Sequence, residues 1–117
     1  MPAKQPRMTG PTRAVLELFL GDPDTPRYGL EIGSHTGLPS GTVHPILARL
    51  EGLAWLDSGW EDIDPTLAGR PRRRFYRLTA AGAAEAEAAL AAARAGRTRL
   101  TARRPAPASP RFGTASA

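Results

Sequence analysis

The chain has 117 residues, 41% of them hydrophobic, and a net charge of +5. This size is typical of one domain and is too small for the scaffold of most stand-alone enzymes. The absence of cysteine excludes disulfides and thiolate metal ligands. No apolar run approaches the roughly 18 residues that span a bilayer, and the first residues lack a signal-peptide pattern. We therefore expect a cytoplasmic protein with no membrane partner.

The positive charge is concentrated in two segments. Of the 16 cationic residues, 15 are arginine; five of these lie in residues 70–77 and six in residues 94–111, with no acid in either segment. Segregated positive charge is typical of proteins that bind a phosphate backbone. A GC-rich coding sequence also produces many arginines and alanines. That alternative accounts better for the total arginine count than for the spacing within residues 70–77.

The N-terminal part predicts a flexible arm followed by a helix. Residues 1–8 are polar and contain proline, so we expect them to form the arm. From Thr9 or Thr12 as far as Gly21, apolar residues recur at helical spacing. This first helix is expected to lie on the hydrophobic core, because its apolar side is too rich for solvent.

A second helix is predicted from residues 27–36, after a turn that contains two prolines. We expect it to bury Tyr28, Leu30 and Ile32. It should end at Gly37, because glycine best tolerates the left-handed conformation that follows a helix terminus.

The third predicted helix, residues 40–52, has two different faces. Ser40 is a suitable N-cap, and Pro45 removes one backbone donor, so we expect a bent or tightened first turn. Apolar residues at i, i+3, i+4 and i+7 should face the core: Val43, Ile46, Leu47 and Leu50. The opposite face carries small or hydrogen-bonding residues, as a helix entering a DNA groove requires: Ser40, Gly41, Thr42, His44 and Arg49.

Residues 53–78 predict a β-hairpin with strands at 53–60 and 72–78. By alternation, Leu56, Ser58 and Trp60 share one face of the first strand, and Arg74, Tyr76 and Leu78 share one face of the second. Residues 69–77 form the arginine-rich part. It would place four side chains on a DNA backbone or minor groove: Arg70, Arg72, Arg73 and Arg74. Phosphate contacts set affinity and register without reading sequence. The alternative for any one arginine is an ordinary solvated surface charge.

A fourth helix is predicted for residues 79–96, capped by Thr79 and broken at Ala95 and Gly96. Residues 97–117 are expected to be a basic disordered tail. We expect the helix to form a homodimer contact through Ala83, Ala86, Leu90 and Ala93. The alternative is a helix that lies on its own domain with the remaining side exposed. Because alanines bury little area, an interface made only here would be weak.

Catalytic and metal-binding patterns are missing from the sequence. The two histidines, His35 and His44, fall on different predicted helices and lack the H-E-x-x-H spacing of zinc enzymes. No phosphate-binding glycine motif is present, and no serine has the context of a nucleophile elbow. We therefore expect no cofactor, no metal and no enzymatic activity. The aromatic residues near the hairpin could line a ligand pocket, although core packing is favoured: Trp55, Trp60, Phe75 and Tyr76.

Several of these residues together resemble PadR-type transcriptional regulators. The likeness covers about residues 12–95 and depends on Tyr28-Gly29, Gly41-Thr42 with Pro45, Leu50-Glu51, Gly69-Arg70-Pro71, Tyr76, and Leu78-Thr79 with Gly82. It implies an α+β, mainly α fold: a winged helix-turn-helix of three helices and a two-stranded wing (residues 9–78) plus a C-terminal dimerisation helix. It also implies a homodimeric repressor, often responsive to a small-molecule effector. His44 replaces a tyrosine common in the family, which leaves base preference open.

The leading hypothesis is a sequence-specific regulator of double-stranded DNA, with recognition helix 40–52 in the major groove. Its two recognition helices would lie about 34 Å apart, one turn of B-DNA. The first alternative is a winged helix used as a protein-interaction module without operator binding. The second is a general basic protein that coats DNA without sequence preference.

Overall fold

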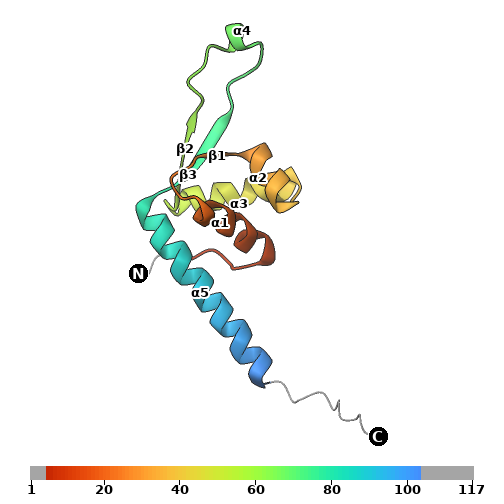
Figure 1. Ribbon diagram of the computed structural model, residues 1–117, viewed down its shortest axis with the longest axis vertical. Helices are drawn as coiled ribbons and strands as arrows, with labels where there is room; N and C mark the ends of the chain where they lie inside the picture. The colour runs from red at the N-terminus through yellow and green to blue at the C-terminus, as the bar shows by residue number, and fades with distance from the viewer. Residues whose placement is uncertain (1–4, 104–117) are drawn as a thin grey trace, which may run out of the picture.

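The computed structural model describes residues 5–103, which form a helical body, a projecting hairpin and a long C-terminal helix (Figure 1). Mainly helical with a small antiparallel sheet, it confirms the predicted fold class. In chain order the elements are α1 (Gly10–Gly21), β1 (Arg27–Tyr28), α2 (Gly29–Thr36), α3 (Ser40–Gly52), β2 (Leu56–Trp60), α4 (Pro65–Ala68), β3 (Arg74–Leu78) and α5 (Ala80–Arg103).

Helix α1 begins and ends where the sequence predicts. The Thr9 hydroxyl caps it by accepting a hydrogen bond from the Thr12 N–H at 3.3 Å. The segment before it differs from a loose arm in the part that the structure describes. Pro6 is buried, and Met8 packs against the core while its carbonyl accepts a hydrogen bond from Arg13 at 2.9 Å. Residues 6–8 therefore pack against the domain.

The second predicted helix begins two residues late. Arg27 and Tyr28 form β1, which pairs with β3 and makes the sheet three-stranded, in the order β1-β3-β2, where a two-stranded hairpin was expected. The helix then runs from Gly29 and ends at Gly37 (φ 74°), as predicted. The expected burial of Leu30 is wrong, since its side chain is 84% exposed. Residues two apart on a helix point to opposite sides, so burying Ile32 turns Leu30 outward.

Helix α3 confirms the inward apolar stripe, with a shift of one residue at its cap. Pro39 is the N-cap and Ser40 the first helical residue. The Pro39 carbonyl accepts from both Thr42 and Val43, at 2.9 and 3.0 Å, so the first turn is tightened as expected. The helix then continues through Pro45 to Gly52.

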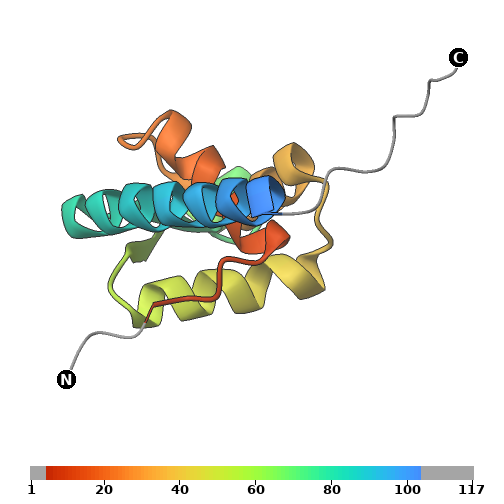
Figure 2. The same cartoon turned by 90° about the horizontal axis from the view of Figure 1, so that it is seen from below.

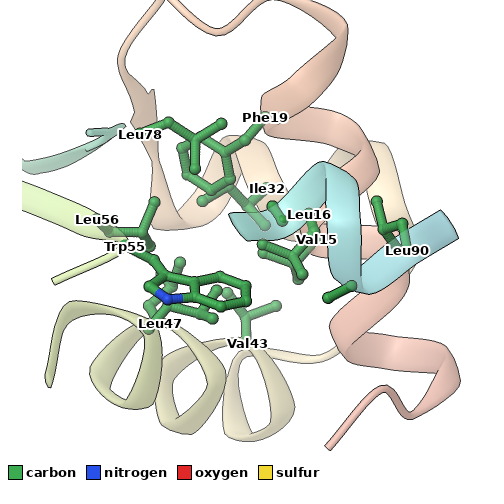
Figure 3. Close-up of a cluster of buried hydrophobic side chains, with 13 residues drawn as sticks. Val15, Leu16, Phe19, Ile32, Val43, Leu47, Trp55, Leu56, Leu78 and Leu90 are labelled. Atoms are coloured by element: carbon green, nitrogen blue, oxygen red, sulfur yellow. The ribbon is translucent and has the colours of Figure 1, made fainter. Parts of the chain in front are cut away.

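One hydrophobic cluster holds the body together (Figure 3). It collects side chains from three helices, both long strands and α5, and includes Trp55, which is 5% exposed. Its largest fully buried members are Phe19, Leu16, Ile32, Leu47, Leu50, Leu56, Val15 and Val43. Burial of such side chains is worth about 1.5–3 kcal/mol each, so this cluster fixes how α3 is presented.

The hairpin of β2 and β3 is shorter than predicted but has the predicted faces. Leu56 pairs with Leu78, Ser58 with Tyr76, and Trp60 with Arg74. The first strand begins at Leu56, not at residue 53. Its neighbour Ala54 has a positive φ of 63°, and the Trp55 carbonyl accepts the Thr79 N–H at 3.0 Å. We call residues 61–73 with the two strands the wing; it projects from the body (Figure 1).

Helix α5 starts as predicted, because the Thr79 hydroxyl accepts the Gly82 N–H at 2.8 Å. The predicted break at Ala95 and Gly96 is wrong, since the helix continues to Arg103. One glycine costs a helix only about 1 kcal/mol relative to alanine, and the flanking alanines and arginines are strong helix formers. Residues 97–103 of the predicted tail are thus helical; the rest of it lies outside the described residues.

Candidate nucleic-acid interface

The outer face of α3 presents the residues that the sequence selects. Ser40, Gly41, His44 and Arg49 are exposed and Thr42 is half-buried. The buried stripe on the opposite side holds this face outward, because Val43, Leu47 and Leu50 are anchored in the core. A rigid helix with small and polar residues outward has the shape and chemistry to enter a major groove.

One of the predicted DNA contacts, Arg70, instead forms an ion pair within the wing. Arg70 donates to both carboxylate oxygens of Glu61, at 2.6 and 3.0 Å. Glu61 also accepts the Arg73 backbone N–H at 2.9 Å. The hydrogen bond from Arg70, joined by the one from Arg73, lowers the pKa of Glu61 to about 2. Arg70 therefore fastens the two sides of the wing, a role that sequence reasoning missed.

Arg72, Arg73 and Arg74 are exposed, and each is held in place by a neighbouring group of the protein. Arg72 donates through Nε to the Ile63 carbonyl at 2.9 Å. The guanidinium of Arg73 lies 5.8 Å from the centre of the Tyr28 ring, and that of Arg74 lies 5.2 Å from the centre of Trp60. Cation–π contacts of this kind hold the charge in place while leaving it available to an anion.

Arg74 also joins the wing to the end of α3. It donates to the Ser58 hydroxyl at 2.6 Å and forms an ion pair with Glu51 at 3.4 Å. Glu51 in turn accepts a hydrogen bond from Ser58. Because Glu51 lies in α3 and Ser58 in β2, this cluster ties the orientation of the wing to that of α3.

Two shallow hollows, of about 240 and 300 Å³, lie beside α2: the smaller one between α2, α3 and the wing, and the larger one between α2 and α3. Leu30 and His44 line both, with Arg73 and Arg74 at the smaller hollow and Ser40 at the larger. Among the residues that the structure describes, no acid lines either one. A Cβ atom at Gly29 would lie 3.2 Å from Cε1 of His44. Glycine there gives the imidazole room beside α2.

The family model for the PadR-like transcriptional regulators matches residues 15–88. The chain belongs to the PadR-like family. No curated protein matches the sequence.

Solved structures of regulators resemble the PadR-like chain. A probable transcriptional regulator from Pseudomonas aeruginosa is 26% identical, with a TM-score of 0.61 over 85% of this chain and 68% of that one. AbfR of Staphylococcus epidermidis is 26% identical, with a TM-score of 0.55 over 70% of this chain. The chain spans about half the length of the two AbfR structures, 54% and 50%. A PadR family regulator from Clostridium difficile R20291 shares the fold at 23% identity, with a TM-score of 0.61 over 79% of this chain and 96% of that one.

The residues assigned to a dimer contact lie mostly inside this PadR-like chain. Ala86 is 0% and Leu90 3% exposed, because the first part of α5 packs on α1 (Figure 2). Ala83 also packs against the core, and Ala93 is half-buried. The assignment of Ala86 and Leu90 to a dimer interface is therefore corrected: they hold α5 on its own domain, which was the alternative.

The two histidines of the PadR-like chain have different surroundings. His35 bonds through Nδ1 to the Glu31 carbonyl one turn earlier in α2, at 2.9 Å, whereas His44 lines the two hollows. Within residues 5–103, no three acidic or histidine side chains are grouped as metal ligands. In the same part of the chain, no helix combines the length and apolarity of a membrane span.

Proposed function

We propose that the chain is a sequence-specific repressor that acts in the cytoplasm and binds a pseudo-palindromic operator as a homodimer. In this proposal α3 occupies the major groove, and the wing lies on the backbone or in the minor groove. The observation that carries it is the junction of the polar α3 face with an arginine wing that Arg74 and Glu51 hold together.

The roles of the residues follow from their positions. Ser40, Gly41, Thr42 and His44 lie in the first half of α3, where side chains of a recognition helix meet base edges. Arg49 lies near the end of α3 and suits a phosphate. On the wing, three exposed arginines would contact phosphates of the DNA backbone: Arg72, Arg73 and Arg74. Arg70 acts by keeping the wing in shape through Glu61.

Dimerisation is assigned to the second half of α5, which extends away from the body (Figure 1). Leu100 is 65% exposed there, a large apolar side chain that the residues described by the structure leave largely uncovered. A small-molecule effector fits the proposal at the cleft of about 430 Å³ between α1 and α5, lined in part by Leu20, Leu90 and Arg94. A ligand there would press on the helix that carries the dimer contact.

Fluorescence anisotropy tests the proposal, with duplexes enriched by the protein itself from a random pool. We expect one motif to be enriched over random duplex. Replacing Arg72, Arg73 and Arg74 with alanine should reduce the log–log salt slope by about 0.9 for each phosphate that the variant no longer neutralises. Replacing the same three arginines with lysine is the matched control, because lysine keeps the positive charge that neutralises a phosphate.

The outcomes separate the three hypotheses. An unchanged slope in the triple variant overturns the wing assignment. Absence of salt-dependent DNA binding supports the protein-interaction module. Equal affinity for enriched and random duplexes supports a DNA-coating protein.

A further inference from the structure

Leu30 is the unusual side chain on the candidate DNA surface. It is 84% exposed at the second position of α2, although α2 buries Ile32 completely. A single exposed leucine is common on protein surfaces, so exposure alone carries no role. Its position is informative, because Leu30 and His44 line both the hollow between α2 and α3 and the hollow between α2, α3 and the wing.

The surroundings of Leu30 favour nucleic acid over a protein or a lipid. The smaller hollow is lined in part by Arg73 and Arg74, and none of the described residues that line either hollow is an acid. The cleft between α1 and α5, in contrast, is lined by Glu17 and Glu87. Leu30 is an apolar side chain with arginines nearby. Such a surface suits a ligand that has an apolar group surrounded by negative charges. Duplex DNA offers this combination at the thymine methyl group, which lies in the major groove near phosphates.

We propose that Leu30 is a specificity-determining residue that packs on a thymine methyl group in each half of the operator. The inference rests on the proposed function, since it requires α3 in the major groove. Leu30 would read the base pair at the edge of the groove, beside those that the first half of α3 reaches. His44, whose ring lies next to Gly29 at the start of α2, limits the space into which a base edge can enter.

The test compares thymine with uracil, which lacks only the methyl group. The strongest duplex from the selection is synthesised with each thymine replaced by deoxyuridine, one position at a time, and titrated with the full chain. Removal of one buried methyl group corresponds to about fourfold weaker binding. We expect the wild-type protein to show this weakening at one thymine position in each half-site.

Leu30→Ala should bind thymine and uracil at that position equally well, whereas Leu30→Met should keep the difference. Truncation of so exposed a side chain leaves the core intact, and circular dichroism checks the fold. Leu67→Ala is the matched control: Leu67 is 86% exposed on the wing, and its truncation should leave the thymine–uracil difference unchanged whatever happens to overall affinity.

Three results bear on the inference. A wild-type protein insensitive to every replacement overturns it, and so does a Leu30→Ala variant that still distinguishes the two bases. Both leave the proposed function intact, because an enriched duplex is still bound. A selection that enriches no duplex overturns the proposed function and the reading by Leu30 with it.

Discussion

Glu61 and Arg70 face each other across the wing and are joined by two hydrogen bonds, one accepted by each oxygen of the carboxylate. The side chain of Glu61 is 11% exposed and that of Arg70 is 35% exposed, so the pair is partly shielded from solvent. Paired arginine and carboxylate groups of this geometry are among the stronger polar contacts in proteins. The pair makes the shape of an arginine-rich wing depend on the carboxylate of Glu61.

The stability of the domain should depend on pH through Glu61. The pKa of Glu61 is about 2 in the folded chain, whereas a free glutamate has a pKa of 4.5. Between these two pH values the unfolded chain therefore binds more protons than the folded chain. The stabilisation is complete above about pH 4.5 and is lost as the pH falls toward 2. Thermal unfolding of Glu61→Gln against wild type should show a Tm gap that is widest near pH 6 and narrows toward pH 2. Glu85→Gln removes the same charge from the exposed surface of α5 as a control. A gap that is constant with pH contradicts the pairing.

Arg70 and Arg72 should differ in what their replacement changes. Arg70→Ala should lower the Tm and loosen the wing, because it leaves Glu61 without its main partner. Arg72→Ala should leave the Tm nearly unchanged and reduce the salt slope of DNA binding by about 0.9. Calorimetry and anisotropy on the two variants measure both quantities. Equal Tm values for the two variants would show that the ion pair does not hold the wing.

Gly82 and Gly96, both in α5, should respond oppositely to alanine. A Cβ atom at Gly82 would lie 2.1 Å from the backbone oxygen of Trp55, whereas nothing lies within 4 Å of one at Gly96. Gly82→Ala should therefore destabilise the domain by at least about 1–3 kcal/mol, because α5 must shift from the core. Gly96→Ala should stabilise it by about 0.5–1 kcal/mol. Urea denaturation measures both, and a neutral Gly82→Ala would contradict the packing.

Leu90 and Leu100 should separate folding from dimerisation. Leu90 is 3% exposed, so Leu90→Ala should cost about 2–5 kcal/mol of unfolding free energy. Leu100→Ala should change the stability of the single chain by less than about 0.5 kcal/mol. Under the proposed dimer, sedimentation equilibrium should show Leu100→Ala dissociating at higher protein concentration than wild type. Unchanged association would place the dimer contact elsewhere on the chain.

The sequence by itself determined the elements whose pattern is local. The apolar spacing of α1 and α3, the glycine after α2, the threonine that caps α5 and the alternation along β2 and β3 each depend on residues a few positions apart. The outward face of α3 was predictable for the same reason, since burying Val43, Leu47 and Leu50 leaves the opposite side exposed.

Only the tertiary structure decided which residues of the candidate surface are free. Pairing of Arg27 with Tyr76 makes β1, after which α2 starts at Gly29, and the burial of Ile32 in the core turns Leu30 outward. The carboxylate that binds Arg70 comes from the other side of the wing, and α1 buries the face of α5 that looked suited to a partner. Such outcomes depend on contacts between residues distant in the chain. Local periodicity describes the faces of a helix or strand, but the packing of the whole chain determines what covers them.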